Sequence, residues 1–117
     1  MARKKESKAK IPDDFPPCYI PCRIEPGMFR EEFLVYLDAR DPHNPNEQIR
    51  AQLLVDQREV SGVSGAPKRH NPADGWLRVT LVGRQGEWAE VVLPQPSQPL
   101  GERVLVARDS VKETPGW

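Results

Sequence analysis

Residues 75–94 read Gly-Trp-Leu-Arg-Val-Thr-Leu-Val-Gly-Arg-Gln-Gly-Glu-Trp-Ala-Glu-Val-Val-Leu-Pro. Apolar residues take alternate positions in both halves of this stretch: Leu77, Val79 and Leu81, then Ala89, Val91 and Leu93. Such alternation is typical of β-strands that bury one face. The connection at 83–86 is short and has glycine at both ends, so the two halves are predicted to form a hairpin.

Further strands are expected on both sides of this hairpin. Alternate positions are again apolar before it, at Ile49, Ala51, Leu53 and Val55. After it we expect one strand at 103–106 and a short last strand at 111–113, joined by a tight turn at 107–110. Residues 28–37 fit two structures. Phe29, Phe33 and Leu37 recur every four residues as in a helix, whereas the Val, Tyr and Phe content favours a strand, which we prefer.

Turn-forming residues divide the chain into short blocks and leave little room for helices. The chain has 13 prolines, and Gly or Pro interrupts it at 25–27, 41–46, 61–75 and 94–101. Five or six short strands without helical crossovers imply an antiparallel sheet, and in a domain of this size the sheet should curl. The sequence therefore predicts an all-β fold, a small antiparallel barrel.

The order of these features resembles an SH3-like barrel over roughly Arg23 to Glu113. A strand is followed by a long polar loop, a central hairpin, a further strand, one short turn and a last strand. The resemblance concerns the fold pattern alone. The peptide-binding residues of signalling SH3 domains are not evident, so their ligand is not carried over.

The chain is expected to have two parts of unlike charge. Residues 1–17 form a predicted disordered tail, basic and rich in proline, and residues 18–114 form the single barrel domain. The first ten residues carry five cations against one anion, and the remaining residues carry twelve cations against sixteen anions. An acidic body repels a phosphate backbone on average.

Membrane insertion and export are not expected. The longest apolar run, 33–37, is far shorter than the roughly 20 residues that cross a bilayer. The basic start is followed by Ile-Pro-Asp-Asp-Phe-Pro-Pro, which is unlike the apolar core of a signal peptide. We therefore expect a cytoplasmic protein without a membrane partner.

No catalytic or metal site is predicted. Three residues separate Cys18 from Cys22, and His43 and His70 could complete a set of four zinc ligands, but the histidines fall in separate polar loops. We interpret the cysteines as ordinary thiols, with zinc and redox roles as open alternatives. No nucleophile, base and orienting group can be placed together, so we expect a protein without enzymatic activity and without a cofactor.

The preferred function is a protein-protein interaction module. Exposed aromatic rings beside cations can grip a peptide, and the candidates are Trp76, Trp88, Arg78, Lys68 and Arg69, with loops 41–48 and 61–75. A tryptophan that only caps the core is an open alternative. The alternative function is binding of RNA or single-stranded DNA, with affinity from the tail cations Arg3, Lys4, Lys5, Lys8 and Lys10.

Overall fold

The structure, a computed structural model, describes residues 17–115. It contains seven strands and two short 3-10 helices. The elements in chain order are β1 (Pro17–Pro26), β2 (Glu32–Asp41), β3 (Asn44–Asp56), η1 (Gln57–Glu59), β4 (Val60–Ser64), β5 (Ala73–Gln85), β6 (Trp88–Ser97), β7 (Gly101–Ala107) and η2 (Arg108–Ser110). Within residues 17–115 no helix has the length and apolar character needed to cross a bilayer.

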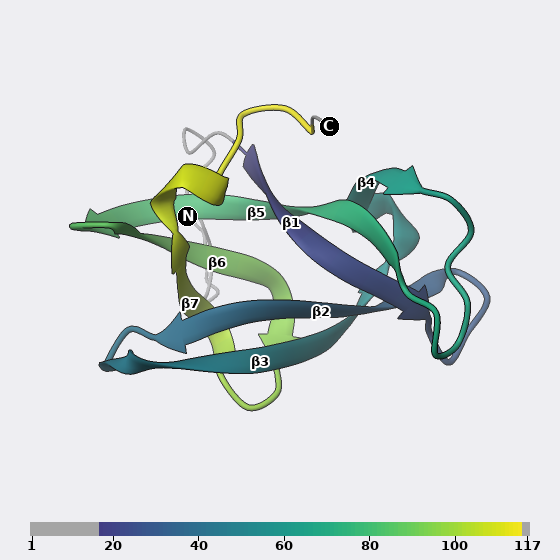
Figure 1. Ribbon diagram of the computed structural model, residues 1–117, viewed down its shortest axis with the longest axis horizontal. Coiled ribbons are helices and arrows are strands. Elements are labelled where there is room, and N and C mark those ends of the chain that lie inside the picture. The colour runs from purple at the N-terminus through teal and green to yellow at the C-terminus, as the bar shows by residue number, and fades with distance from the viewer. Residues whose placement is uncertain (1–16, 116–117) are drawn as a thin grey trace, which may run out of the picture.

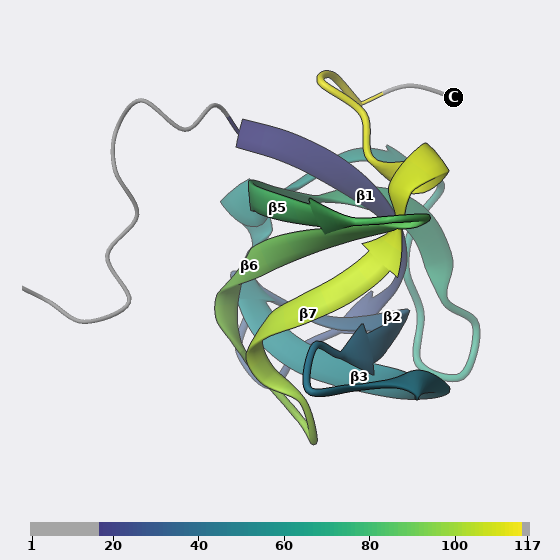
Figure 2. The ribbon, with the colours of Figure 1, turned by 90° about the vertical axis from the view of Figure 1, so that its left-hand side faces the viewer.

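Five of the strands close into an antiparallel barrel. β5, β6 and β7 form a meander, β7 pairs with β2, β2 with β1, and β1 with β5 (Figures 1 and 2). The other two strands extend the sheet, because β3 pairs with β2 and β4 pairs with β5. The predicted all-β fold and small antiparallel barrel are confirmed, with seven strands in place of five or six.

The hairpin in residues 75–94 is present and is tighter than predicted. Gln85 pairs with Trp88, so only Gly86 and Glu87 form the turn, and Gly86 has a φ of 59°. Glycine adopts this left-handed conformation at low cost, which explains why the chain can reverse here. Gly83, expected to begin the turn, lies within β5 at an irregularity in the pairing.

Alternate positions of the strands supply the core. Along β1 these are Cys18, Ile20, Cys22 and Ile24, and each is buried. β2, β3, β5, β6 and β7 add aliphatic side chains in the same way, so one continuous cluster fills the barrel. The burial follows from the two-residue period of a strand, which sends every second side chain inward.

The strand preferred for residues 28–37 is confirmed in the second half of the segment, which belongs to β2. Three other expectations about elements need correction. Residues 61–64 were expected in the loop 61–75 and belong to β4. Residues 44–48 begin β3, so the loop expected at 41–48 shrinks to a turn. The predicted last strand at 111–113 is reduced to one bridge between Lys112 and Tyr19. The predicted tail lies outside the described residues, apart from Pro17, which begins β1.

Candidate functional site

Trp76 is buried, contrary to the prediction that it is an exposed binding residue. Its exposed fraction is 5%, and it lies in β5 between Pro21 of β1 and Ser61 of β4. The error came from placing residues 61–75 in a loop. Since β4 pairs with this part of β5, the segment is an interior part of the sheet and Trp76 is covered.

Trp88 is half-buried and stacks on an arginine that the sequence did not point out. The guanidinium carbon of Arg40 lies 4.4 Å from the centroid of the indole ring, within the range of a cation-π interaction. Arg40 Nη1 also donates a hydrogen bond of 2.8 Å to the Pro45 carbonyl oxygen. The ring therefore packs against its own chain on one side, which accounts for its partial burial.

Arg78 does not join Trp88 as predicted. Arg78 is exposed on β5 opposite Tyr19, and it lies seven residues before Gln85, which pairs with Trp88. At a rise of about 3.3 Å per residue the two positions are roughly 20 Å apart along the strand. The candidate residues therefore do not form one surface.

Lys68 and Arg69 are exposed on a tight turn at the other end of the barrel. Lys68 and Asn71 exchange backbone hydrogen bonds of 3.2 and 2.9 Å, so Arg69 and His70 form the turn. His70 has a φ of 63°, a conformation that costs a non-glycine residue free energy. In Figure 1 this β4–β5 connection and the β1–β2 connection lie at the same end.

A seam in the barrel runs along β2. β1 pairs with β2 only from Tyr36 back to Phe33, and β7 pairs with β2 only at Arg40. Within the described pairing, residues 37–39 have no partner on this side of β2. Two hollows of about 270 and 240 Å³ open along the seam and share Pro21, Leu37 and Asp38.

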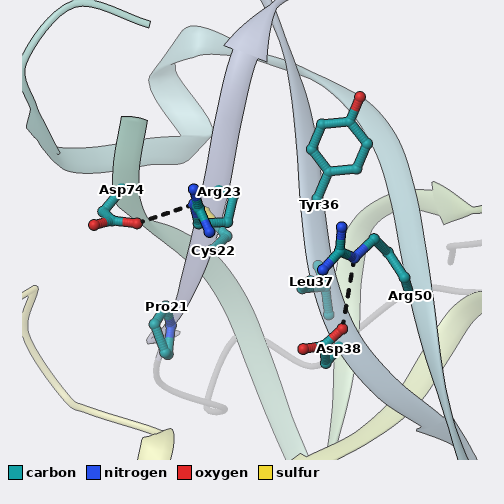
Figure 3. A pocket seen from close by; sticks show the side chains of 8 residues that line it. All are labelled: Pro21, Cys22, Arg23, Tyr36, Leu37, Asp38, Arg50 and Asp74. Atoms are coloured by element: carbon teal, nitrogen blue, oxygen red, sulfur yellow. Dashed lines mark ion pairs between the residues drawn. The ribbon is translucent and has the colours of Figure 1, made fainter. Parts of the chain in front are cut away.

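The first of these, the charged hollow, is edged by two ion pairs (Figure 3). Arg23 Nε lies 3.2 Å from Asp74 Oδ1, and Arg50 Nε lies 3.8 Å from Asp38 Oδ1. All four side chains are more than half exposed to solvent, so each pair contributes less than about 1 kcal/mol to stability. The charges at this edge are already matched, which makes it a poor receptor for a charged ligand.

Cys22 lines the same hollow, and its thiol stays protonated near neutral pH. Burial, with a smaller contribution from the Asp74 carboxylate, raises the pKa of its thiol to about 12. Burial also raises the pKa of Cys18, the other free cysteine, followed by the effect of Glu113. A thiol is nucleophilic as its thiolate, so neither group is suited to catalysis near neutral pH.

The residues considered for zinc are not brought together. In the described part of the chain no three His, Cys, Asp or Glu side chains are grouped so that they could hold a metal ion. His43 and His70 sit in turns at different places in the sheet, and both are exposed.

A surface that sequence reasoning missed lies at the connection between β1 and β2. Met28 and Phe29, here called the apolar tip, are 78% and 70% exposed, the largest exposures of bulky apolar residues in residues 17–115. Gly27 N–H donates to the Glu32 carbonyl at 3.0 Å, and Glu32 N–H donates to the Phe29 carbonyl at 3.1 Å. The connection is thus held closed with both side chains at its apex.

The return of the chain at Gly27 and the neighbouring Pro67 set the surroundings of the apolar tip. A Cβ atom on Gly27 would approach Glu32 Cβ to 2.7 Å and the Glu32 carbonyl carbon to 2.9 Å, so glycine permits this close return of the chain. Pro67 lines the shallow hollow beside Met28 and Phe29, which brings the basic turn at 68–71 next to the tip. The sequence signal for this exposed surface was a pair of bulky apolar residues between Gly27 and Arg30 that fall outside the alternating pattern of the strands.

Comparison with known proteins adds no relative. No protein-family model matches the chain, and no curated protein or solved structure is significantly similar to it.

Proposed function

We propose that this protein is a non-enzymatic interaction module that binds another protein through its apolar tip. The observation that supports the proposal is the exposure of Met28 and Phe29 side by side on a connection closed by backbone hydrogen bonds. Phe and Met are enriched in the buried centres of protein interfaces. Removing each side chain from water contributes about 1.5–3 kcal/mol.

The residues around the tip resemble a typical protein interface, which has an apolar centre and a charged rim. Phe33 and Pro67 are partly buried beside it and extend the apolar area. Lys68 and Arg69 are exposed on the adjacent turn and supply a charged rim. Because the connection is already closed, little backbone entropy is lost when a partner covers it, which favours binding.

Site-specific photo-crosslinking in the native cell tests this proposal. A photoreactive phenylalanine analogue at position 29 should capture a discrete set of proteins, and the same analogue at position 54 should not. Leu54 is the matched control because it is the other bulky apolar residue with an exposed side chain among residues 17–115.

Two variants complete the test. Met28→Ser combined with Phe29→Ser should abolish capture of the partner by an affinity-tagged chain, and Leu54→Ser should leave capture intact. Circular dichroism melting of each variant checks the fold. Equal capture by the tip variant and by the control, with both folded, contradicts the proposal.

The second candidate function is accessory nucleic-acid binding. It is favoured by Lys68 and Arg69, whose exposed cations share a turn that contains no carboxylate. The tail cations proposed to add affinity lie outside the described residues. Binding of single-stranded RNA should fall steeply with salt and weaken when Lys68→Glu and Arg69→Glu are combined. A salt-independent signal, or none, removes this candidate.

A further inference from the structure

We infer that the second hollow on the seam binds a carboxylate group at Arg40. This site, here called the arginine hollow, has a volume of about 240 Å³ and lies where the end of β2 faces β6 and β7. It is independent of the proposed protein-binding surface, because Arg40 and the apolar tip lie at opposite ends of β2.

The charge of Arg40 has no carboxylate partner among residues 17–115. The ion pairs described there do not include Arg40. The acidic residues close to it in sequence are engaged elsewhere, since Asp38 is 3.8 Å from Arg50 and Asp41 Oδ1 accepts a 2.9 Å hydrogen bond from the His43 amide. A half-buried guanidinium without a counter-charge favours an anion from outside the chain.

Most of the hydrogen-bonding capacity of Arg40 is also unused in the described part of the chain. A guanidinium group has five N–H donors, and one contact, from Nη1 to the Pro45 carbonyl, is made. Nε is enclosed and has no hydrogen-bond acceptor among residues 17–115. Carboxylates match the fork of a guanidinium with two parallel hydrogen bonds, which makes them the ligand of choice for such a group.

The backbone directs Arg40 into this hollow. The pairing of β2 with β3 shifts register between Ala39 and Asp41, which places Arg40 at a β-bulge. Bulges re-aim a side chain, and this one directs the guanidinium over the Trp88 ring on β6. The ring holds the guanidinium in one orientation before a ligand arrives, which lowers the entropic cost of binding.

The side chains that line the arginine hollow indicate which carboxylate-bearing ligand would fit. Leu105, Val106 and Leu37 line the hollow together with Gln48 and Ser110. Asp38 also lines it, and the charge of this carboxylate is matched by Arg50 at 3.8 Å. The hollow is smaller than the 300–1,000 Å³ or so of a drug-sized site, so it fits one short group. The matching ligand is a carboxylate on a short apolar stem, which is the chemistry of a small organic acid or of the last residue of a peptide.

Nuclear magnetic resonance distinguishes these two sources. The probes are sodium propionate, the peptide acetyl-Ala-Ala-Val with a free C-terminus, and the same peptide as its amide. We expect the indole N–H resonance of Trp88 and the Nε–H resonance of Arg40 to shift and saturate with a carboxylate probe and to stay unchanged with the amide. A shift with propionate alone identifies a small-acid site, and tighter binding of the free peptide identifies a C-terminus site.

Variants assign the effect to Arg40. Arg40→Gln should weaken binding by about tenfold or more, since hydrogen bonds to charged groups contribute roughly 1.5–3 kcal/mol. Arg78→Gln, which removes an exposed arginine elsewhere, should bind as the unaltered chain does. Equal binding of the amide, no shift with any carboxylate, or full binding by a folded Arg40→Gln overturns the inference. The amide comparison uses the unaltered chain, so it decides even where Arg40→Gln does not fold.

Discussion

At the scale of single residues, burial makes the thiol of Cys22 a weaker acid than an ordinary cysteine thiol. Its thiol pKa rises from the ordinary 9.0 to about 12, first because of burial and then because of the Asp74 carboxylate. The unfolded chain loses this proton near pH 9, whereas the folded chain keeps it until about pH 12. Between these values the unfolded state gains the free energy of ionisation and the folded state does not.

We therefore expect stability to fall as pH rises above about 9, by up to roughly 1.4 kcal/mol per pH unit from this group. Cys18, whose pKa is also raised by burial, adds an effect of the same sign. Urea unfolding from neutral pH to about pH 10 measures the slope, and Cys22→Ala should make it shallower. The same slope in both proteins contradicts this explanation.

At the scale of elements, the turn at 68–71 carries backbone strain. His70 has a φ of 63°, a left-handed conformation that is uncommon for residues other than glycine, although asparagine, aspartate and histidine adopt it more often than the rest. His70→Asn should raise the free energy of unfolding by up to about 1 kcal/mol, because the short asparagine side chain can hydrogen-bond to the backbone in this conformation. Chemical denaturation measures the change, and Arg69→Asn at the neighbouring exposed position serves as the control. An unchanged midpoint for His70→Asn would show that the turn tolerates histidine without cost.

Strands that bury one face could be predicted from the sequence, because the period of two is visible in residues such as Leu77, Val79 and Leu81. β4 could not be predicted in this way. Its sequence, Val-Ser-Gly-Val-Ser, reads as a loop, and only its pairing with β5 makes it a strand. The burial of Trp76 was missed for that reason.

The candidate sites were harder to predict than the strands, because they depend on register. Arg40 meets Trp88 only because a bulge follows Ala39 and because β2 reaches β7 across the seam. The apolar tip depends on the return of the chain at Gly27, a local geometry that alternation does not reveal. Trp88 does lie against a cation, but this cation is Arg40 and not the predicted Arg78, and the role of Trp88 in binding stays a prediction.

At the scale of the whole molecule, a single bridge ties the end of the described chain to its beginning. Lys112 N–H donates to the Tyr19 carbonyl at 2.9 Å, and Tyr19 N–H donates to the Lys112 carbonyl at 2.8 Å. Lys112→Pro removes the first donor, and we expect it to destabilise the fold by about 1–3 kcal/mol. Lys112→Ala keeps both backbone bonds and should be nearly neutral, because the side chain is exposed.

Thermal unfolding of the two Lys112 variants measures the difference. A lower midpoint for Lys112→Pro alone shows that the bridge contributes to the stability of the barrel. Equal midpoints would show that the barrel closes without it and that the segment after η2 is dispensable.

The bridge between Lys112 and Tyr19 also determines where a label can be attached without covering the apolar tip. It brings the two ends of the described chain together at the start of β1, whereas the apolar tip follows the end of that strand. Ten residues of strand separate these points, a distance of roughly 30 Å. A fluorescent label attached at Lys112 would therefore leave the tip unobstructed.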